Sequence, residues 1–88
     1  MDRFDDSLSS LCGKEMASAR KAKDGERIAG MIQSLTSILG RTIAMATNGE
    51  PVATDTLLTG AENLMREEAA GFAPFAALAA ARAAAKEG

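Results

Sequence analysis

The residues that could carry out chemistry in this sequence are few, and the first of them is a lone cysteine. Histidine, the commonest general base and metal ligand, is absent from all 88 residues. Cys12 therefore has no histidine with which to form a nucleophilic pair, and a single cysteine cannot close an internal disulfide. We expect Cys12 to be an ordinary reduced thiol, with an intermolecular disulfide or a reactive thiol as the alternatives.

The carboxylates are the second group to consider, because clusters of them can bind metal ions. Glu62, Glu67 and Glu68 lie close together in the sequence, but on a helix they point in different directions. No glycine-rich phosphate loop ending in Gly-Lys-Ser or Gly-Lys-Thr is present. The sequence therefore predicts no catalytic residue, no cofactor and no metal site, and we expect a protein that is not an enzyme.

Half of the ten basic residues gather in one short stretch, the only charged feature of note. This basic cluster consists of Lys14, Arg20, Lys21, Lys23 and Arg27. Glu15, Asp24 and Glu26 lie among these bases, and no aromatic residue interleaves with them. The pattern favours a solvated helix face, with contact to phosphate or to an acidic protein surface as the alternatives.

Length and composition limit how well one copy could hold itself together. A chain of 88 residues forms one domain at most and buries only about 60–65% of its unfolded surface. Phe4, Phe72 and Phe75 are its only aromatic residues, and neither a disulfide nor a zinc site is available to compensate. Oligomerisation is the remaining common remedy, so we expect a homodimer.

Charge and hydropathy bear on location and partners. The net charge of −2 is too small to indicate nucleic acid or anionic lipid as a partner of the whole chain. The first ten residues are acidic and polar, unlike a secretory signal, and polar residues interrupt the apolar run that a membrane span would need. We therefore expect a cytoplasmic protein that does not enter a membrane.

The stretch from Asp24 to Asn48 carries the clearest structural signal. Its large apolar residues recur at spacings of three and four, which places them on one broad face of an α-helix. Asp24 is a plausible N-cap, while Asn48 and Gly49 followed by Pro51 form a stop signal. The sequence predicts a helix over 25–47.

The apolar face of this helix is wider than one partner helix can cover, so we divide it between two partners. The expected self-association residues are Met31, Leu35, Ile38, Thr42 and Met45. The expected contacts within the subunit join Ile28, Ile32, Leu39 and Ile43 to Leu57, Ala61, Leu64 and Met65.

The segments on either side are less regular. Residues 1–23 are expected to form a short helix or to be flexible, and 24–88 to form the helical domain. After a loop that contains Pro51, a second main helix is expected over 55–70, capped by Thr54 or Asp55, with a competing start at Thr59. Gly71 and Pro74 indicate a break or kink, followed by an alanine-rich helix from residue 74.

The expected fold class is all-α, with a helical hairpin of 25–47 and 55–70 inside a dimeric helical bundle. The leading functional hypothesis is a non-enzymatic interaction module: a regulator, adaptor or inhibitor that acts by protein–protein contact and self-associates. One alternative is an accessory nucleic-acid-binding regulator that uses the basic cluster at 14–27. The other is a structural subunit that polymerises.

Overall fold

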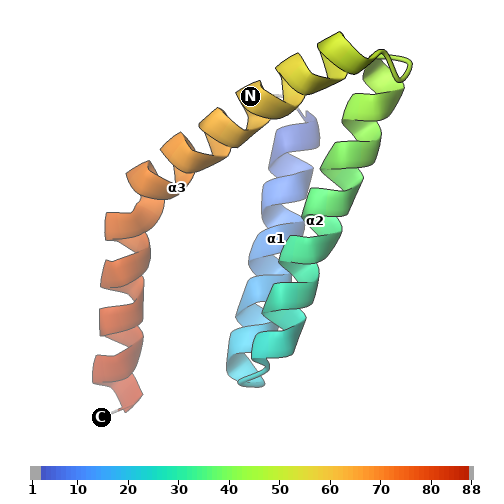
Figure 1. Ribbon diagram of the computed structural model, residues 1–88. Coiled ribbons are helices and arrows are strands. Elements are labelled where there is room, and N and C mark those ends of the chain that lie inside the picture. Colours follow the sequence, from blue (N-terminus) through green and yellow to red (C-terminus); the bar gives the residue numbers. More distant parts are fainter. Residues whose placement is uncertain (1–2, 88) are drawn as a thin grey trace. The chain divides into compact units, whose positions relative to one another are not determined.

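All of the regular structure that the chain forms in residues 3–87, the part that the computed structural model describes, is helical. Helix α1 spans Arg3–Lys21, α2 spans Gly25–Ala46 and α3 spans Pro51–Glu87 (Figure 1). The expected all-α class is confirmed. Residues 1, 2 and 88, the outer ends of the two expected segments, lie outside the described residues. The chain divides into two compact units, 1–42 and 43–88.

Helix α1 takes up nearly all of the N-terminal segment. It is 19 residues long, although Gly13 and several serines give it modest helix propensity. Asp5 and Asp6 lie in its first turn, and Arg20 and Lys21 lie in its last turn. This placement puts negative charge at the positive end of the helix dipole and positive charge at its negative end, which stabilises the helix.

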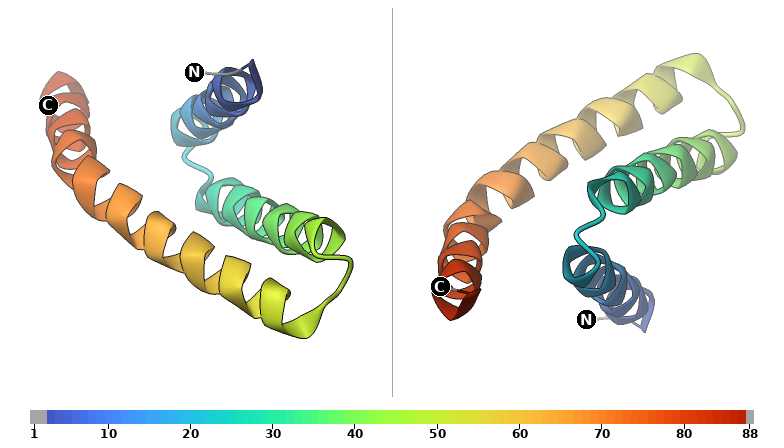
Figure 2. Two further views of the ribbon diagram at one scale, coloured as in Figure 1. Left: turned by 90° about the horizontal axis from the view of Figure 1, so that it is seen from above. Right: turned by 90° about the horizontal axis from the view of Figure 1, so that it is seen from below.

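A tight turn joins α1 to α2. The Asp24 backbone N–H donates to the Ala19 carbonyl at 2.9 Å, and the Lys23 N–H donates to the Arg20 carbonyl at 3.0 Å. These two bonds form a Schellman motif, in which Lys23 adopts the left-handed conformation (φ 56°). The Asp24 carboxylate then accepts the Arg27 N–H at 3.1 Å and caps α2, as the sequence predicted. Helices α1 and α2 consequently run antiparallel, as Figures 1 and 2 show.

Helix α2 ends within one residue of its expected boundary, through the same kind of motif. The Gly49 N–H donates to the Ala44 carbonyl at 2.9 Å, and the Asn48 N–H donates to the Met45 carbonyl at 3.3 Å. Asn48 and Gly49 both have positive φ, at 52° and 73°. Asparagine and glycine tolerate this conformation better than other residues, so the predicted stop signal acts as expected.

The start of α3 differs from the prediction. The helix begins at Pro51, so the expected starts at Thr54, Asp55 and Thr59 are all wrong. Proline suits the first helical position, because its φ is already helical and its missing N–H would have no partner there. The Glu50 carboxylate caps the new start by accepting hydrogen bonds from the N–H groups of Val52 and Ala53.

At residues 71–74 the expected kink is present, but the expectation of a separate alanine-rich helix from residue 74 is wrong. Helix α3 continues for 37 residues with Pro74 in its interior, so 55–70 and the alanine-rich segment belong to one helix. Proline removes one backbone hydrogen bond and crowds the preceding turn, which bends a helix without having to end it. Figure 1 shows α3 bending in its orange part, and both views of Figure 2 agree.

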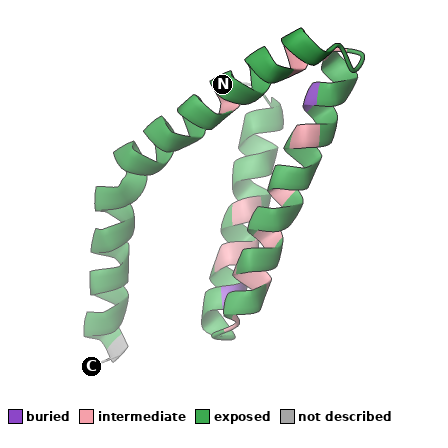
Figure 3. Cartoon of the chain, viewed as in Figure 1, coloured by how far each residue is buried: buried purple, intermediate pink, exposed green. Residues whose placement is uncertain are grey.

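Very little of the chain is buried. Among residues 3–86, whose side-chain exposure is defined, the buried residues are Ala19 at 0% exposure and Ile43 at 6%. In unit 1, half-buried residues gather along the facing sides of α1 and α2 (Figure 3). They are Cys12, Glu15 and Met16 of α1, and Arg27, Ile28, Met31 and Leu35 of α2; Gly40 is also half-buried but lies off this face. Their spacing of three to four residues is that of one helix face meeting another.

Candidate interaction surface

A groove of about 530 Å³ runs between α1 and α2 within unit 1. Its α1 side is formed by Leu8, Leu11, Cys12 and Glu15, and its α2 side by Arg27, Gly30, Met31, Ser34, Leu35 and Ile38. Most of these side chains are apolar. We call these ten residues the hairpin groove.

An ion pair closes the groove at the end nearest the turn. The Arg27 guanidinium donates two hydrogen bonds to the Glu15 carboxylate, at 3.1 Å from Nε and 3.0 Å from Nη2. The two-pronged geometry matches the planar guanidinium to the carboxylate and orients both side chains. Glu15 raises the pKa of Arg27, first by accepting these hydrogen bonds and then through its charge; desolvation opposes this, and Asp24 adds a smaller increase.

The ion pair also fixes how far along the hairpin each groove residue lies. Leu11 is four residues from Glu15, and Met31 is four residues from Arg27, so this apolar pair lies about one helical turn farther from the connection. Leu8 and Leu35 lie about two turns away by the same reasoning. The groove is therefore charged beside the turn and apolar over the rest of its length.

Three of the five predicted self-association residues line the groove. Met31 and Leu35 are half-buried in it, and Ile38 is 52% exposed. Thr42 and Met45 do not line it: the Thr42 hydroxyl donates to the Ile38 carbonyl at 2.7 Å, and Met45 is 79% exposed.

The residues of α1 in the groove were not predicted as a site. The signal was present, because Phe4, Leu8, Leu11 and Glu15 recur at alternating spacings of four and three. The missing information was the pairing of Glu15 with Arg27, twelve residues away, which aligns that face of α1 with α2.

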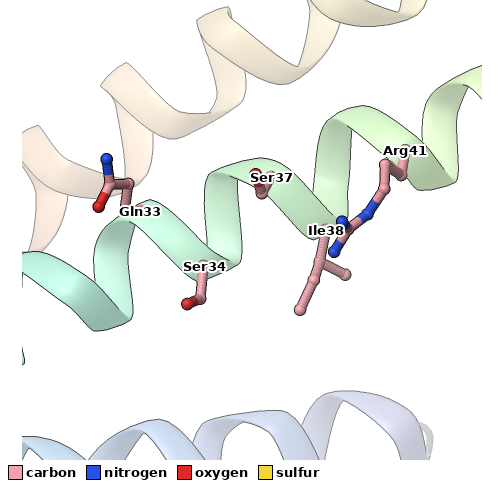
Figure 4. A pocket seen from close by; sticks show the side chains of 5 residues that line it. All are labelled: Gln33, Ser34, Ser37, Ile38 and Arg41. Carbon is pink, nitrogen blue, oxygen red and sulfur yellow. The ribbon is translucent and has the colours of Figure 1, made fainter.

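A polar shelf lies on the flank of α2 beside the groove. Gln33, Ser34, Ser37, Ile38 and Arg41 form this second hollow, of about 350 Å³. In Figure 4, Ser34 and Ile38 point toward the side of α2 where the ribbon of α1 lies, while Gln33 points away from it. Ser34 and Ile38 are thus shared by the shelf and the groove, and they mark the boundary between polar and apolar surface.

The structure divides the basic cluster. Arg27 is held by Glu15, whereas Lys14, Arg20, Lys21 and Lys23 are exposed on the other parts of α1 and in its turn. Because one of its five cations is already paired, the cluster offers less charge to a phosphate than the sequence suggested.

Unit 2 presents apolar surface on α3. Large apolar side chains are exposed along the helix: Val52, Leu57, Leu58, Leu64, Met65, Phe72, Phe75 and Leu78. The rings of Phe72 and Phe75 lie 5.9 Å apart between centroids and form one aromatic patch. Glu62 and Arg66 form an i, i+4 ion pair at 2.9 Å.

The three carboxylates considered as metal ligands, Glu62, Glu67 and Glu68, are exposed. Within residues 3–87, no three His, Cys, Asp or Glu side chains are grouped closely enough to hold a metal ion. In the same range, no helix has the length and apolar character needed to cross a membrane.

Comparison with known proteins leaves the structure as the sole guide to function. No protein-family model matches the chain, and neither curated proteins nor solved structures give a significant match.

Proposed function

We propose that this protein is a non-enzymatic interaction module that self-associates, as a homodimer, and acts on another protein by direct contact. A small regulator, an adaptor and an inhibitor all fit this description, and the cytoplasm is the proposed location. The observation that carries the proposal is the scarcity of buried residues: Ala19 and Ile43 are the buried residues within 3–86, while fifteen large apolar side chains in that range are exposed.

The total exposed area shows how much surface one copy leaves uncovered. The chain exposes 7290 Å². A folded monomer of its mass, 9.1 kDa, is expected to expose about 4,900 Å². The difference of about 2,400 Å² exceeds the roughly 800 Å² that each partner contributes to a standard protein–protein interface. One copy therefore has enough uncovered surface for a dimer contact and for a second contact with another protein.

The two units offer different surfaces for these contacts. The hairpin groove is concave and bounded by charge, which favours a defined packing partner. Helix α3 instead presents large apolar side chains along much of its length, with the Phe72–Phe75 patch near its middle. Aromatic residues are enriched in protein interfaces, so α3 is the surface that we assign to the protein partner.

Self-association is tested by sedimentation equilibrium of the full chain over about a hundredfold range of concentration. We expect the average mass to rise from that of one chain to that of two. A mass that stays at one chain throughout would contradict the self-association half of the proposal. A mass that continues to rise beyond two would favour the polymerising subunit.

The partner contact is tested by affinity capture with the wild-type chain and with Phe75→Glu. A protein retained by the first and lost with the second supports contact through α3, provided that both chains have the same circular dichroism spectrum. Glu67→Gln is the matched control, because it changes an exposed side chain on the same helix without touching the aromatic patch. Equal capture by Phe75→Glu would exclude the α3 surface.

A further inference from the structure

We propose that the hairpin groove is filled by the same groove of a second copy, so that two α1–α2 hairpins form a four-helix bundle. In this bundle both hairpins point their turns in the same direction, and α1 of each copy lies against α2 of the other. The inference rests on the proposed self-association and specifies the surface and the orientation that it uses.

The chemistry along the groove selects this orientation over the opposite one. A two-fold axis parallel to the helices relates the two copies without turning one over. Residues equally far from their own turn therefore lie at the same height in both copies. Glu15 of each copy then faces Arg27 of the other, so four charges of alternating sign meet beside the turns. Leu8 and Leu11 of each copy face Met31, Leu35 and Ile38 of the other, so apolar surface meets apolar surface.

The opposite orientation, with the turns at opposite ends, places unlike surfaces together. The Glu15–Arg27 pair of each copy would then face the apolar end of the other groove, near Leu8 and Ile38. This ion pair would lose water without gaining a further charged partner, which is unfavourable. The charge pattern of the groove is complementary to itself in one orientation only.

Helix direction is compatible with this orientation but does not select it, because turning the partner end over end, with α1 against α1 and α2 against α2, also makes adjacent helices antiparallel. Because α1 and α2 are antiparallel within a copy, placing α1 against the partner's α2 makes every pair of adjacent helices antiparallel. Adjacent antiparallel helices have favourable dipole interactions and are the common arrangement in four-helix bundles.

The centre of the groove has room for side chains of a second copy. A Cβ atom placed on Gly30 would meet no other atom within 4 Å. Cys12 and Ser34, which are also small, lie in the same groove. Leucine and methionine side chains from a partner can therefore enter between the helices, as knobs enter holes in helical bundles.

Complementary charge reversals test the proposal. Glu15→Arg gives a chain with two positive groove charges, and Arg27→Glu gives a chain with two negative ones. Alone, each variant should form a homodimer with a dissociation constant raised at least about tenfold, because four like charges meet. Mixed together, they should form a heterodimer in preference to either homodimer, because every charge at positions 15 and 27 then faces an opposite charge on the other copy. Native mass spectrometry with one chain isotopically labelled measures all three dimers.

The Glu62–Arg66 ion pair provides a matched control on α3. Its partners lie 2.9 Å apart, close to the 3.0 Å of Glu15 and Arg27. Mixing Glu62→Arg with Arg66→Glu should give homodimers and heterodimers in statistical proportion. A preference for the heterodimer in this control as well would overturn the proposal, because charge would then act without regard to the groove.

A second measurement covers the case in which a reversed charge unfolds the hairpin. One chain carries Leu8→Cys and the other Leu35→Cys, each with Cys12→Ser, so that a disulfide joins only different copies. Rapid cross-linking in the mixture supports the bundle. The absence of this cross-link would overturn the bundle. So would a mixture of the two charge-reversal variants that fails to form the heterodimer. If Glu15→Arg and Arg27→Glu each dimerise alone as well as wild type, the groove assignment is overturned but self-association still holds. If the wild-type chain is monomeric, the groove assignment and the proposed self-association are both overturned.

Discussion

Replacing Leu35 with glutamate tests whether this chain depends on a second copy to fold. Leu35 lies in the apolar part of the hairpin groove, half-buried by its own chain. Its neighbour Ile38 is 52% exposed, so the apolar surface around Leu35 is only partly covered within one copy. A carboxylate at this position would be tolerated by a monomer whose groove is open to water. It would not be tolerated in a groove that is filled.

The size of the effect follows from the remaining exposure. Full burial of a leucine side chain is worth about 1.5–3 kcal/mol, so completing the burial of a half-buried one contributes about 1 kcal/mol. Two copies lose about 2 kcal/mol, and desolvating two carboxylates without partners costs at least about 2 kcal/mol more. The dimer is thus weakened by about 4 kcal/mol, which is about a thousandfold in the dissociation constant.

Urea denaturation at several protein concentrations measures this coupling. For a dimer that unfolds to two chains, a tenfold rise in concentration adds about 1.4 kcal/mol of stability. With an m value of about 2 kcal/mol/M, the wild-type midpoint should rise by about 0.7 M urea. The midpoint of Leu35→Glu should be lower and independent of concentration. Val52→Glu, which adds the same charge at an exposed position in the first turn of α3, should keep the wild-type concentration dependence.

Two results would refute this reasoning. A wild-type midpoint that does not move with concentration would mean that the chain folds alone. A Leu35→Glu midpoint that moves as much as that of wild type would mean that the dimer uses another surface.

Three further predictions concern local structure. Glu50→Ala removes the acceptor for two N–H groups at the start of α3, so the free energy of unfolding should fall by about 1 kcal/mol, measured by urea denaturation with Glu67→Ala as the control. Lys23→Gly relieves a left-handed φ of 56° and should raise the melting temperature, through a gain of about 0.5 kcal/mol; a lower melting temperature would contradict the role assigned to this turn. Gly60→Ala should stabilise the exposed part of α3 by up to about 1 kcal/mol, whereas Gly30→Ala should weaken the dimer in sedimentation because its new methyl group enters the groove; equal gains at both positions would argue against a filled groove.

Helix α2 could be predicted from the sequence because several local signals agreed. The apolar spacing, the cap at Asp24 and the stop at Asn48 and Gly49 each depend only on residues close by in the sequence. Part of the candidate site followed from the same pattern, since Met31, Leu35 and Ile38 line the groove. A pattern within one helix cannot specify which other helix covers it, and the contribution of α1 was therefore missed.

The boundaries of α3 were mispredicted because proline can either end a helix or occupy its first position. Pro51 ends the α2 connection, but it also occupies the one helical position where a missing N–H costs nothing. The cap comes from Glu50, a residue type that is uncommon at this position, so the usual search for Ser, Thr, Asp or Asn passed over it. At Pro74 the competing influences are close in size, and local signals do not show which one prevails.

Helix α3 continues past Pro74 because the helix propensity of its alanines offsets the cost of the proline. Proline inside a helix costs about 3 kcal/mol. Nine alanines lie between residues 73 and 85, and each is about 0.3–0.7 kcal/mol more favourable in a helix than an ordinary residue, which offsets that cost. The helix therefore continues through Pro74 because of its backbone propensity, and Phe72, Phe75 and Leu78 are exposed on it. Since alanine stabilises the helix while covering almost no neighbouring surface, the same composition that keeps α3 continuous leaves its aromatic patch exposed.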